Sequence, residues 1–217
     1  NMVDWYLNSR FLNKKSYLMH NRKLIKIRQE KENISNFDQK IFFKDYQNDF
    51  VERVSLINEE FENSLAFGFR GSKLEFSKNV KNVIYGNLGK SDKTNIIYDE
   101  ELIPFKESSL DLIMSFFNLH FANDVPGILY QTLRSLKPNG LFIASMFCEN
   151  TLQELNYSFI KAEEEICGGM SPRVSPFAKL QALASLMQEI NFSLPVADID
   201  RHSCLLYTSP SPRDSDT

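Results

Sequence analysis

Short apolar runs alternate with longer amphipathic segments along most of the chain. Leu110 to Phe117 (LDLIMSFF) and Leu141 to Phe147 (LFIASMF) are almost continuously apolar, which is typical of strands buried on both faces of a sheet. Val80 to Tyr85 and Thr94 to Tyr98 are β-branched and aromatic runs closed by turn residues, and they predict two more strands. Asn63 to Lys73 (NSLAFGFRGSK) predicts a strand that enters a glycine-containing turn.

Helical periodicity separates these strands. Asp38 to Phe61 predicts an amphipathic helix, and Val125 to Leu136 predicts another that Pro138 and Gly140 stop. Strands that alternate with helices, and that are buried on both faces, predict an α/β fold with a doubly wound sheet.

Two more helices are expected after the last strand. Thr151 and Glu154 have the spacing of a capping box, at the start of a helix that ends at Gly168-Gly169. Ser175-Pro176 predicts the N-cap and first-turn proline of the next helix.

The length of 217 residues fits one domain with additional segments at its ends. We predict an N-terminal basic helical extension over residues 1–40, the α/β domain over 41–200 and a disordered tail over 201–217. The basic residues between Lys14 and Lys31 are interpreted as a solvated helix face in preference to a binding patch.

Composition narrows the classes of function. A formal net charge of −3 argues against a protein built mainly to hold nucleic acid. The three cysteines form no C-x-x-C pair, so the sequence predicts neither a disulfide framework nor a metal site, and it favours a reducing compartment. The longest apolar-rich stretch, Leu110 to Ala122, is too short to span a bilayer.

Candidate chemistry follows the strands. In an open parallel sheet the ligand lies outside the carboxyl ends of the strands. This rule selects Gly68 to Gly71, Gly86-Asn87, Asp99-Glu100, and Ser115 to His120. Taken alone, these positions also fit an ordinary turn, a loop aspartate and a half-buried packing histidine, so spacing gives a place but no activity.

The residues around the fourth strand resemble a known superfamily. EELIPFKESSLDLIMSFFNLHF (Glu100 to Phe121) and LRSLKPNGLFIASMF (Leu133 to Phe147) are similar to class I S-adenosylmethionine-dependent methyltransferases. TLQEL (Thr151 to Leu155) and GGMSPRVSPF (Gly168 to Phe177) resemble one subgroup more closely. That subgroup contains complex I assembly factors described as arginine hydroxylases, and bacterial relatives similar to malonyl-carrier-protein O-methyltransferases. His20 to Leu24 also resembles the FDRKL that opens these proteins.

The resemblance implies S-adenosyl-L-methionine as cofactor, held by a Rossmann-like domain. It implies that Asp99 and Glu100 lie at the adenine end, with Asn87 where the family has the acid that grips the ribose hydroxyls. It further implies that Gly68 and Gly71 lie on the glycine-rich loop. Ser115, Leu119 and His120 then lie beside the reactive methyl, with His120 as the candidate catalytic base.

The chain departs from the family pattern at three places. Ala66 replaces the aspartate of the family's LDLGCGxG loop, which also lacks one glycine here, and Asn87 replaces the ribose acid. The resemblance also leads us to expect that the C-terminal strands of the sheet are missing after Asp200, and that the Ser-, Pro- and Asp-rich end from Ser209 is not native.

Three functions remain as hypotheses. The first is a methyltransferase of unknown acceptor, which the resemblance extends to a small molecule, a carrier protein or a protein arginine. The second is a hydroxylase-like assembly factor acting on a respiratory complex I subunit. The third is a non-catalytic relative that keeps the fold and binds a partner. The expected location is the cytoplasm of a bacterium or the mitochondrial matrix of a eukaryote.

Overall fold

A five-stranded parallel sheet forms the centre of the molecule, with the strand order β3-β2-β1-β4-β5. The computed structural model describes residues 19–31, 37–69, 74–76, 78–90 and 94–203. The strands are β1 (Phe61–Phe67), β2 (Val80–Asn87), β3 (Ile96–Ile97), β4 (Leu110–Phe116) and β5 (Leu136–Ser145). The order reverses between β1 and β4, which confirms the doubly wound α/β fold and defines its switch point.

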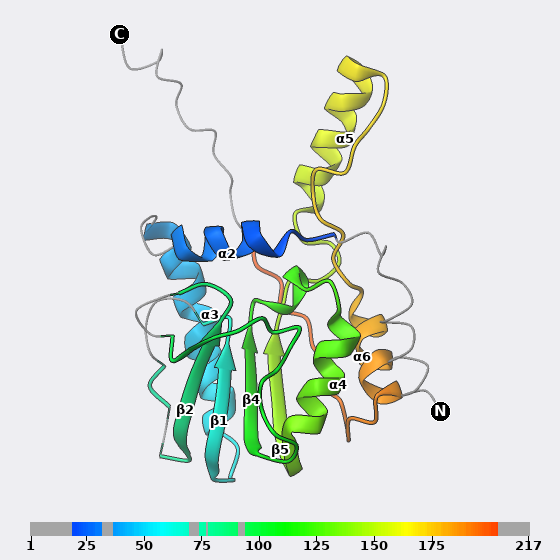
Figure 1. Cartoon of the computed structure of the whole chain (residues 1–217). Coiled ribbons are helices and arrows are strands. Elements are labelled where there is room, and N and C mark those ends of the chain that lie inside the picture. The colour runs from blue at the N-terminus through cyan, green and yellow to red at the C-terminus, as the bar shows by residue number, and fades with distance from the viewer. Residues whose placement is uncertain (1–18, 32–36, 70–73, 77, 91–93, 204–217) are drawn as a thin grey trace.

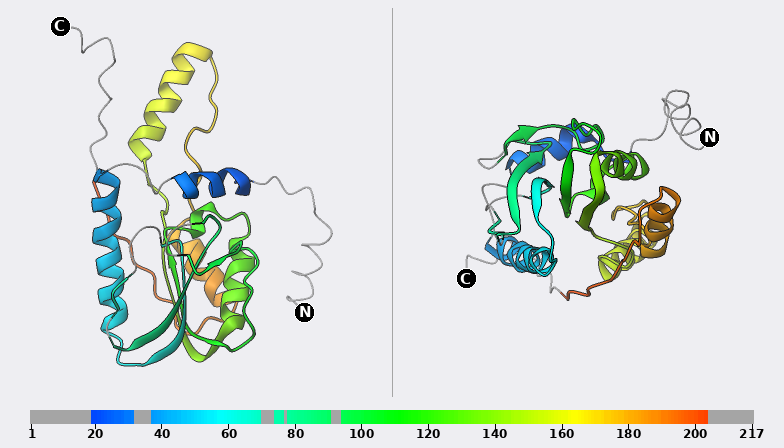
Figure 2. Two further views of the ribbon diagram at one scale, coloured as in Figure 1. Left: turned by 60° about the vertical axis from the view of Figure 1, so that its left-hand side comes forward. Right: turned by 90° about the horizontal axis from the view of Figure 1, so that it is seen from below.

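Helices lie around this sheet, as Figure 1 shows. They are α2 (Arg22–Lys31), α3 (Phe37–Ser55), α4 (Val125–Ser135), α5 (Gln153–Cys167) and α6 (Leu180–Glu189), with a short 3₁₀ turn η2 (Leu119–Phe121) after β4. Helix α2 runs across the carboxyl ends of the strands, and α5 projects away from the body of the molecule (Figures 1 and 2).

Two apolar clusters, one on each face of the sheet, hold α3 and α4 in place. On one face, Phe50 and Val54 of α3 pack with Leu112 and Met114 of β4. On the other, Ile128 of α4 packs with residues that include Leu65, Phe67 and Ile113. Successive strand residues point to opposite faces, so a strand covered on both sides is apolar throughout. This explains why the apolar run at β4 could be recognised in the sequence.

The helices depart from the sequence predictions at their ends. Helix α3 ends at Ser55, because Phe61 already begins β1 and is 2% exposed in the core. The capping box at Thr151 is not formed. Leu152 is the N-cap of α5 in a left-handed conformation, and the Thr151 hydroxyl donates to the Cys148 carbonyl instead. The Ser175-Pro176 prediction was also wrong in position, since α6 begins at Leu180.

Strand β5 begins earlier than predicted and includes Pro138 and Gly140. Its register against β4 shifts here: between two paired positions β4 advances from Leu110 to Leu112 while β5 advances from Leu136 to Leu141. The extra residues form an irregularity in an edge strand of the described sheet, where a proline is tolerated because a ladder hydrogen bond is not needed. Helix α4 ends at Ser135, before the proline and glycine that were predicted to stop it, and both residues lie inside the strand that follows.

Candidate functional site

The carboxyl edge of the sheet brings the predicted site residues to one side of the molecule. Gly68 follows β1, Asn87 is the last residue of β2, and Asp99 and Glu100 follow β3. Ser115 lies near the end of β4, and Leu119 and His120 are in η2. The prediction for Gly71 lies outside the described residues.

Gly68 allows β1 to pass very close to the end of β4. Its φ is +82°, and a Cβ at this position would lie 2.1 Å from the carbonyl oxygen of Phe116 and 2.8 Å from Cβ of Asn118. Both the conformation and the close approach require glycine. The sequence predicted a loop glycine for approach to a ligand, and the structure shows that Gly68 is needed for packing between two strand ends.

Asn87 connects the ends of β1 and β2. Its Oδ1 accepts from the backbone N–H of Gly68 at 3.0 Å, and its Nδ2 donates to the carbonyl of Phe69 at 3.3 Å and to Oγ1 of Thr94 at 3.4 Å. Asn87 is only 8% exposed, so both halves of the amide are used inside the protein. A carboxylate could replace the acceptor at this position but not the donor.

We therefore expect Asn87→Asp to destabilise the chain by about 1–3 kcal/mol, since the carboxylate would face the Phe69 carbonyl without a donor between them. Urea unfolding measures this change. Asn82→Asp is the matched control, because Asn82 is an exposed residue of the same strand. Equal stability of the two variants would show that the Asn87 amide does not hold the β1 end.

At the end of β3, two acidic residues meet an arginine from α2. Arg22 Nη2 lies 2.7 Å from Asp99 Oδ1 and 2.6 Å from Glu100 Oε1. Its Nη1 also donates to the carbonyl of Phe121 at 3.1 Å. Glu100 is 2% exposed, whereas the side chain of Asp99 keeps 31% of its surface exposed. Asp99 is thus the member of the acidic pair that a ligand can reach.

Tyr98 packs between this acidic pair and β2. A Cβ on Gly86 would lie 2.1 Å from Cε1 of Tyr98, so the ring rests directly on the β2 backbone. Burial raises the pKa of Tyr98 well above its ordinary value, and the nearby Glu100 carboxylate raises it further. The phenol therefore stays protonated, and its hydroxyl has no hydrogen-bond partner among the described residues.

Two buried acceptors at the end of β4 also lack a hydrogen-bond partner in the described part of the chain: Ser115 Oγ and Asn118 Oδ1. Ser115 is 0% exposed and Asn118 is 3% exposed. An unsatisfied buried polar atom is unfavourable by about 1–3 kcal/mol, so such atoms point to a ligand or water. Oxygen acceptors of this kind suit the ammonium group of an amino-acid ligand, which has only donors to offer.

His120 lies among aromatic rings. Its ring centroid is 4.1 Å from Phe121, 4.8 Å from Phe147 and 6.1 Å from Phe177. His120 is 9% exposed, so the packing interpretation of this histidine describes its surroundings well. Phe177 comes from the segment between α5 and α6, which places that segment beside the end of β4.

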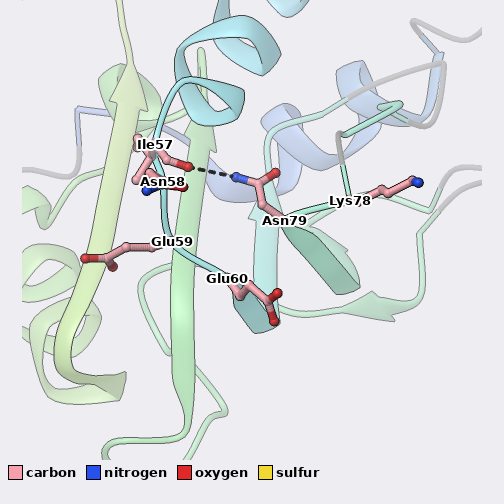
Figure 3. A pocket seen from close by; sticks show the side chains of 6 residues that line it. All are labelled: Ile57, Asn58, Glu59, Glu60, Lys78 and Asn79. Atoms are coloured by element: carbon pink, nitrogen blue, oxygen red, sulfur yellow. Dashed lines mark hydrogen bonds between the residues drawn. The ribbon is translucent and has the colours of Figure 1, made fainter.

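A separate hollow of about 240 Å³ lies at the opposite edge of the sheet. Figure 3 shows its lining, from the residues that precede β1 (Ile57 to Glu60) and those that precede β2 (Lys78 and Asn79). Asn79 Nδ2 donates to the carbonyl of Ile57 at 3.2 Å across this hollow. Since ligands of doubly wound sheets bind at the carboxyl edge, this hollow is not the candidate site.

Within the described ranges, no group of three or more His, Cys, Asp or Glu side chains is placed to hold a metal ion. None of the helices in those ranges is both long and apolar enough to cross a membrane.

The strand order and the polar residues at the carboxyl edge define a Rossmann-like, doubly wound α/β domain. The family model described as "Methyltransferase domain" matches residues 72–144, a range that contains β2, β3, β4, α4 and most of β5.

Two curated relatives extend the similarity. The chain is 42% identical over 106 residues to "Arginine-hydroxylase NDUFAF5, mitochondrial" of Homo sapiens, a match that covers 49% of this chain and 31% of that protein. It is 30% identical over 106 residues to the malonyl-[acyl-carrier protein] O-methyltransferase of Xylella fastidiosa, covering 48% of this chain and 34% of the relative.

Among solved structures, a phosphoethanolamine N-methyltransferase 2 of Haemonchus contortus in complex with S-adenosyl-L-methionine aligns with 68% of this chain and 36% of its own. The TM-score is 0.48 and the identity 16%. The chain thus matches about a third of the length of these curated relatives.

Sequence reasoning missed Arg22 and Asn118 as site residues. The assignment of Arg22 to a solvated basic face is wrong for its side chain, which is 16% exposed and paired with two carboxylates. Its place in the segment that resembles FDRKL was the only signal for such a role. Asn118 gave no signal beyond its place within the stretch from Ser115 to His120.

Proposed function

We propose that this chain carries an S-adenosylmethionine-dependent methyltransferase site at the carboxyl edge of β1, β2, β3 and β4. The match of residues 72–144 to the methyltransferase domain supports this function. The observation that carries it is the pair of buried, unsatisfied acceptors Ser115 Oγ and Asn118 Oδ1 at the switch point, where a ligand of this fold binds.

The residues present fit the cofactor. Asp99 offers a partly exposed carboxylate for the adenine amino group, and Ser115 and Asn118 offer acceptors for the methionine ammonium group. The ribose end fits less closely, because the Asn87 amide already bonds to Gly68 and Phe69. We therefore expect weaker ribose binding than in relatives with an acid there, by several-fold in affinity.

When bound, S-adenosylmethionine supplies a methyl group already activated by the sulfonium, whose sulfur keeps the bonding electron pair as the methyl moves to the acceptor. The protein has to hold the acceptor in line and keep water out. A carboxylate acceptor needs no base. A nitrogen or hydroxyl acceptor must lose a proton, and we assign that role to His120, at the end of β4 beside Phe147 and Phe177.

A second candidate is a protein-arginine hydroxylase that assists assembly of respiratory complex I. The 42% identity to the NDUFAF5 protein, whose name describes an arginine hydroxylase, favours the hydroxylase activity. The name of the NDUFAF5 protein also supports a mitochondrial location if the source is a eukaryote.

Mass spectrometry of acceptors separates the two candidates. The chain is incubated with S-adenosylmethionine bearing a deuterated methyl group, together with malonyl-loaded carrier protein or an arginine-containing peptide. We expect a labelled methyl group on one acceptor, and slower labelling of that acceptor by an Asp99→Asn variant when S-adenosylmethionine is below saturation. A gain of one oxygen atom without the label would overturn the methyltransferase proposal in favour of the hydroxylase, and no change in either acceptor's mass would count against both.

A further inference from the structure

Helix α2 forms a cover over the carboxyl edge of the sheet (Figures 1 and 2). It contacts the loops that follow three different strands. After β2, Gly89 donates its backbone N–H to Gln29 Oε1 at 3.1 Å. After β3 and β4, Arg22 reaches Asp99, Glu100 and the Phe121 carbonyl.

The attachment of this cover is mainly polar. Ile25 and Gln29 are the buried residues of α2, whereas Leu24 is 50% exposed and Ile27 is 45% exposed. Ile25 is the only buried apolar side chain among the described residues of α2, so burial of apolar surface contributes little to holding the helix in place. The docked position of α2 therefore depends strongly on the hydrogen bonds and ion pairs to the site loops.

Arg22 is the centre of these polar contacts. Its guanidinium meets two carboxylates and one backbone carbonyl, which matches the planar fork of donors that arginine presents. Glu100 is buried, and removing the cationic partner of a buried carboxylate is strongly unfavourable. Without Arg22, Asp99 and Glu100 would face each other as like charges.

Asp99 keeps acceptor capacity beyond its contacts with Arg22. Oδ1 accepts from Arg22 Nη2 and from the backbone N–H of Glu101, and Oδ2 accepts from Arg22 Nε at 3.4 Å. A carboxylate offers about four lone-pair sites. One acceptor site on Oδ2 is thus available for a ligand amino group while Arg22 fixes the carboxylate in place.

We propose that Arg22 is a positioning residue for the cofactor, which orients the Asp99 carboxylate toward adenine and couples docking of α2 to occupation of the site. This inference rests on the proposed methyltransferase function. Coupling of this kind is reciprocal: if α2 docking strengthens ligand binding, ligand binding must stabilise docked α2 by the same factor. A residue with only a structural role would not produce that ligand dependence.

Two measurements on the full chain test the proposal. Calorimetry with S-adenosylhomocysteine gives affinity, and hydrogen exchange with and without the same compound gives the protection of the α2 amides. The variants are Arg22→Gln, Arg22→Lys and, as a control, Lys23→Gln, which removes an exposed cation from the same helix.

We expect Arg22→Gln to weaken binding about tenfold or more, because it removes charge-assisted hydrogen bonds that hold Asp99. Arg22→Lys keeps the charge but loses the fork, so it should restore part of the affinity, and Lys23→Gln should bind like the wild type. Bound S-adenosylhomocysteine should slow exchange of the α2 amides in the wild type and have a much smaller effect in Arg22→Gln.

The outcomes separate this inference from the proposed function. If the wild type does not bind, the proposed function fails and this inference fails with it. The inference alone fails if the wild type binds and both Arg22 variants bind with the affinity of the wild type. It also fails if the wild type binds but the ligand leaves hydrogen exchange of the α2 amides unchanged. Should Arg22→Gln not fold by circular dichroism, the Arg22→Lys variant decides by the same two criteria.

Discussion

Replacing Gly68 with alanine is expected to destabilise the chain by about 3 kcal/mol or more, because backbone strain and a steric clash add at one position. The φ of +82° is unfavourable for a residue with a Cβ. The added Cβ would also lie 2.1 Å from the Phe116 carbonyl oxygen, which is backbone in a central strand and cannot turn away. Chemical unfolding monitored by circular dichroism measures the change.

Gly168→Ala and Gly169→Ala are matched controls for the two contributions. Gly168 has a φ of +67°, and a Cβ added there would meet nothing within 4 Å, so this variant isolates the conformational strain, about 1–2 kcal/mol. A Cβ added at Gly169 would meet no atom within 4 Å either, and Gly169 has no unfavourable φ, so its replacement should change stability little. A Gly68→Ala variant no less stable than Gly168→Ala would contradict the close approach of β1 to β4.

Restoring the family's aspartate at position 66 is expected to destabilise this chain by about 3–5 kcal/mol. Ala66 is 0% exposed in β1, and the cluster around it contains Phe50, Met114 and other apolar side chains. A carboxylate there has no partner among these residues. Because a domain of this kind is stable by only about 5–15 kcal/mol in total, the variant should lose a large share of its stability.

Ala144→Asp provides the control for this substitution, since Ala144 is an exposed alanine in edge strand β5. Its free energy of unfolding should change by no more than about 1 kcal/mol. Equal free energies of unfolding for Ala66→Asp and Ala144→Asp would contradict this prediction, because the core around β1 would then accept a charge. The alanine at position 66 would in that case not be required for packing.

The sheet could be predicted from the sequence wherever burial on both faces makes a strand continuously apolar. The strand predicted from Leu110 became β4, and the helix predicted from Val125 became α4, which is capped by Asp124 through the Gly127 N–H. The spacing of apolar residues indicates which faces of a strand or helix are buried, and burial of these faces is what holds β4 and α4 in the fold.

Element ends and long-range polar pairs could not be predicted in the same way. Pro138 and Gly140 are helix-breaking residues and predict a helix end. In the structure α4 has already ended before them, and the irregular edge strand β5 contains both residues. Thr151 has the spacing of a cap, but its hydroxyl donates to the Cys148 carbonyl, and Leu152 is the N-cap of α5. Arg22 and Asp99 are 77 positions apart, and no local pattern indicates that they meet.

Binding of S-adenosylmethionine to the wild-type chain, measured by calorimetry beside Asp99→Asn and Asp45→Asn, tests the central claim most directly. Asp45 is an exposed acid of α3, away from the proposed contacts, and its replacement controls for net charge. The carboxyl-edge site predicts binding by the wild type and by Asp45→Asn, with affinity several-fold to tenfold weaker in Asp99→Asn. Absence of binding by folded wild-type protein, or equal affinities for all three, would contradict it.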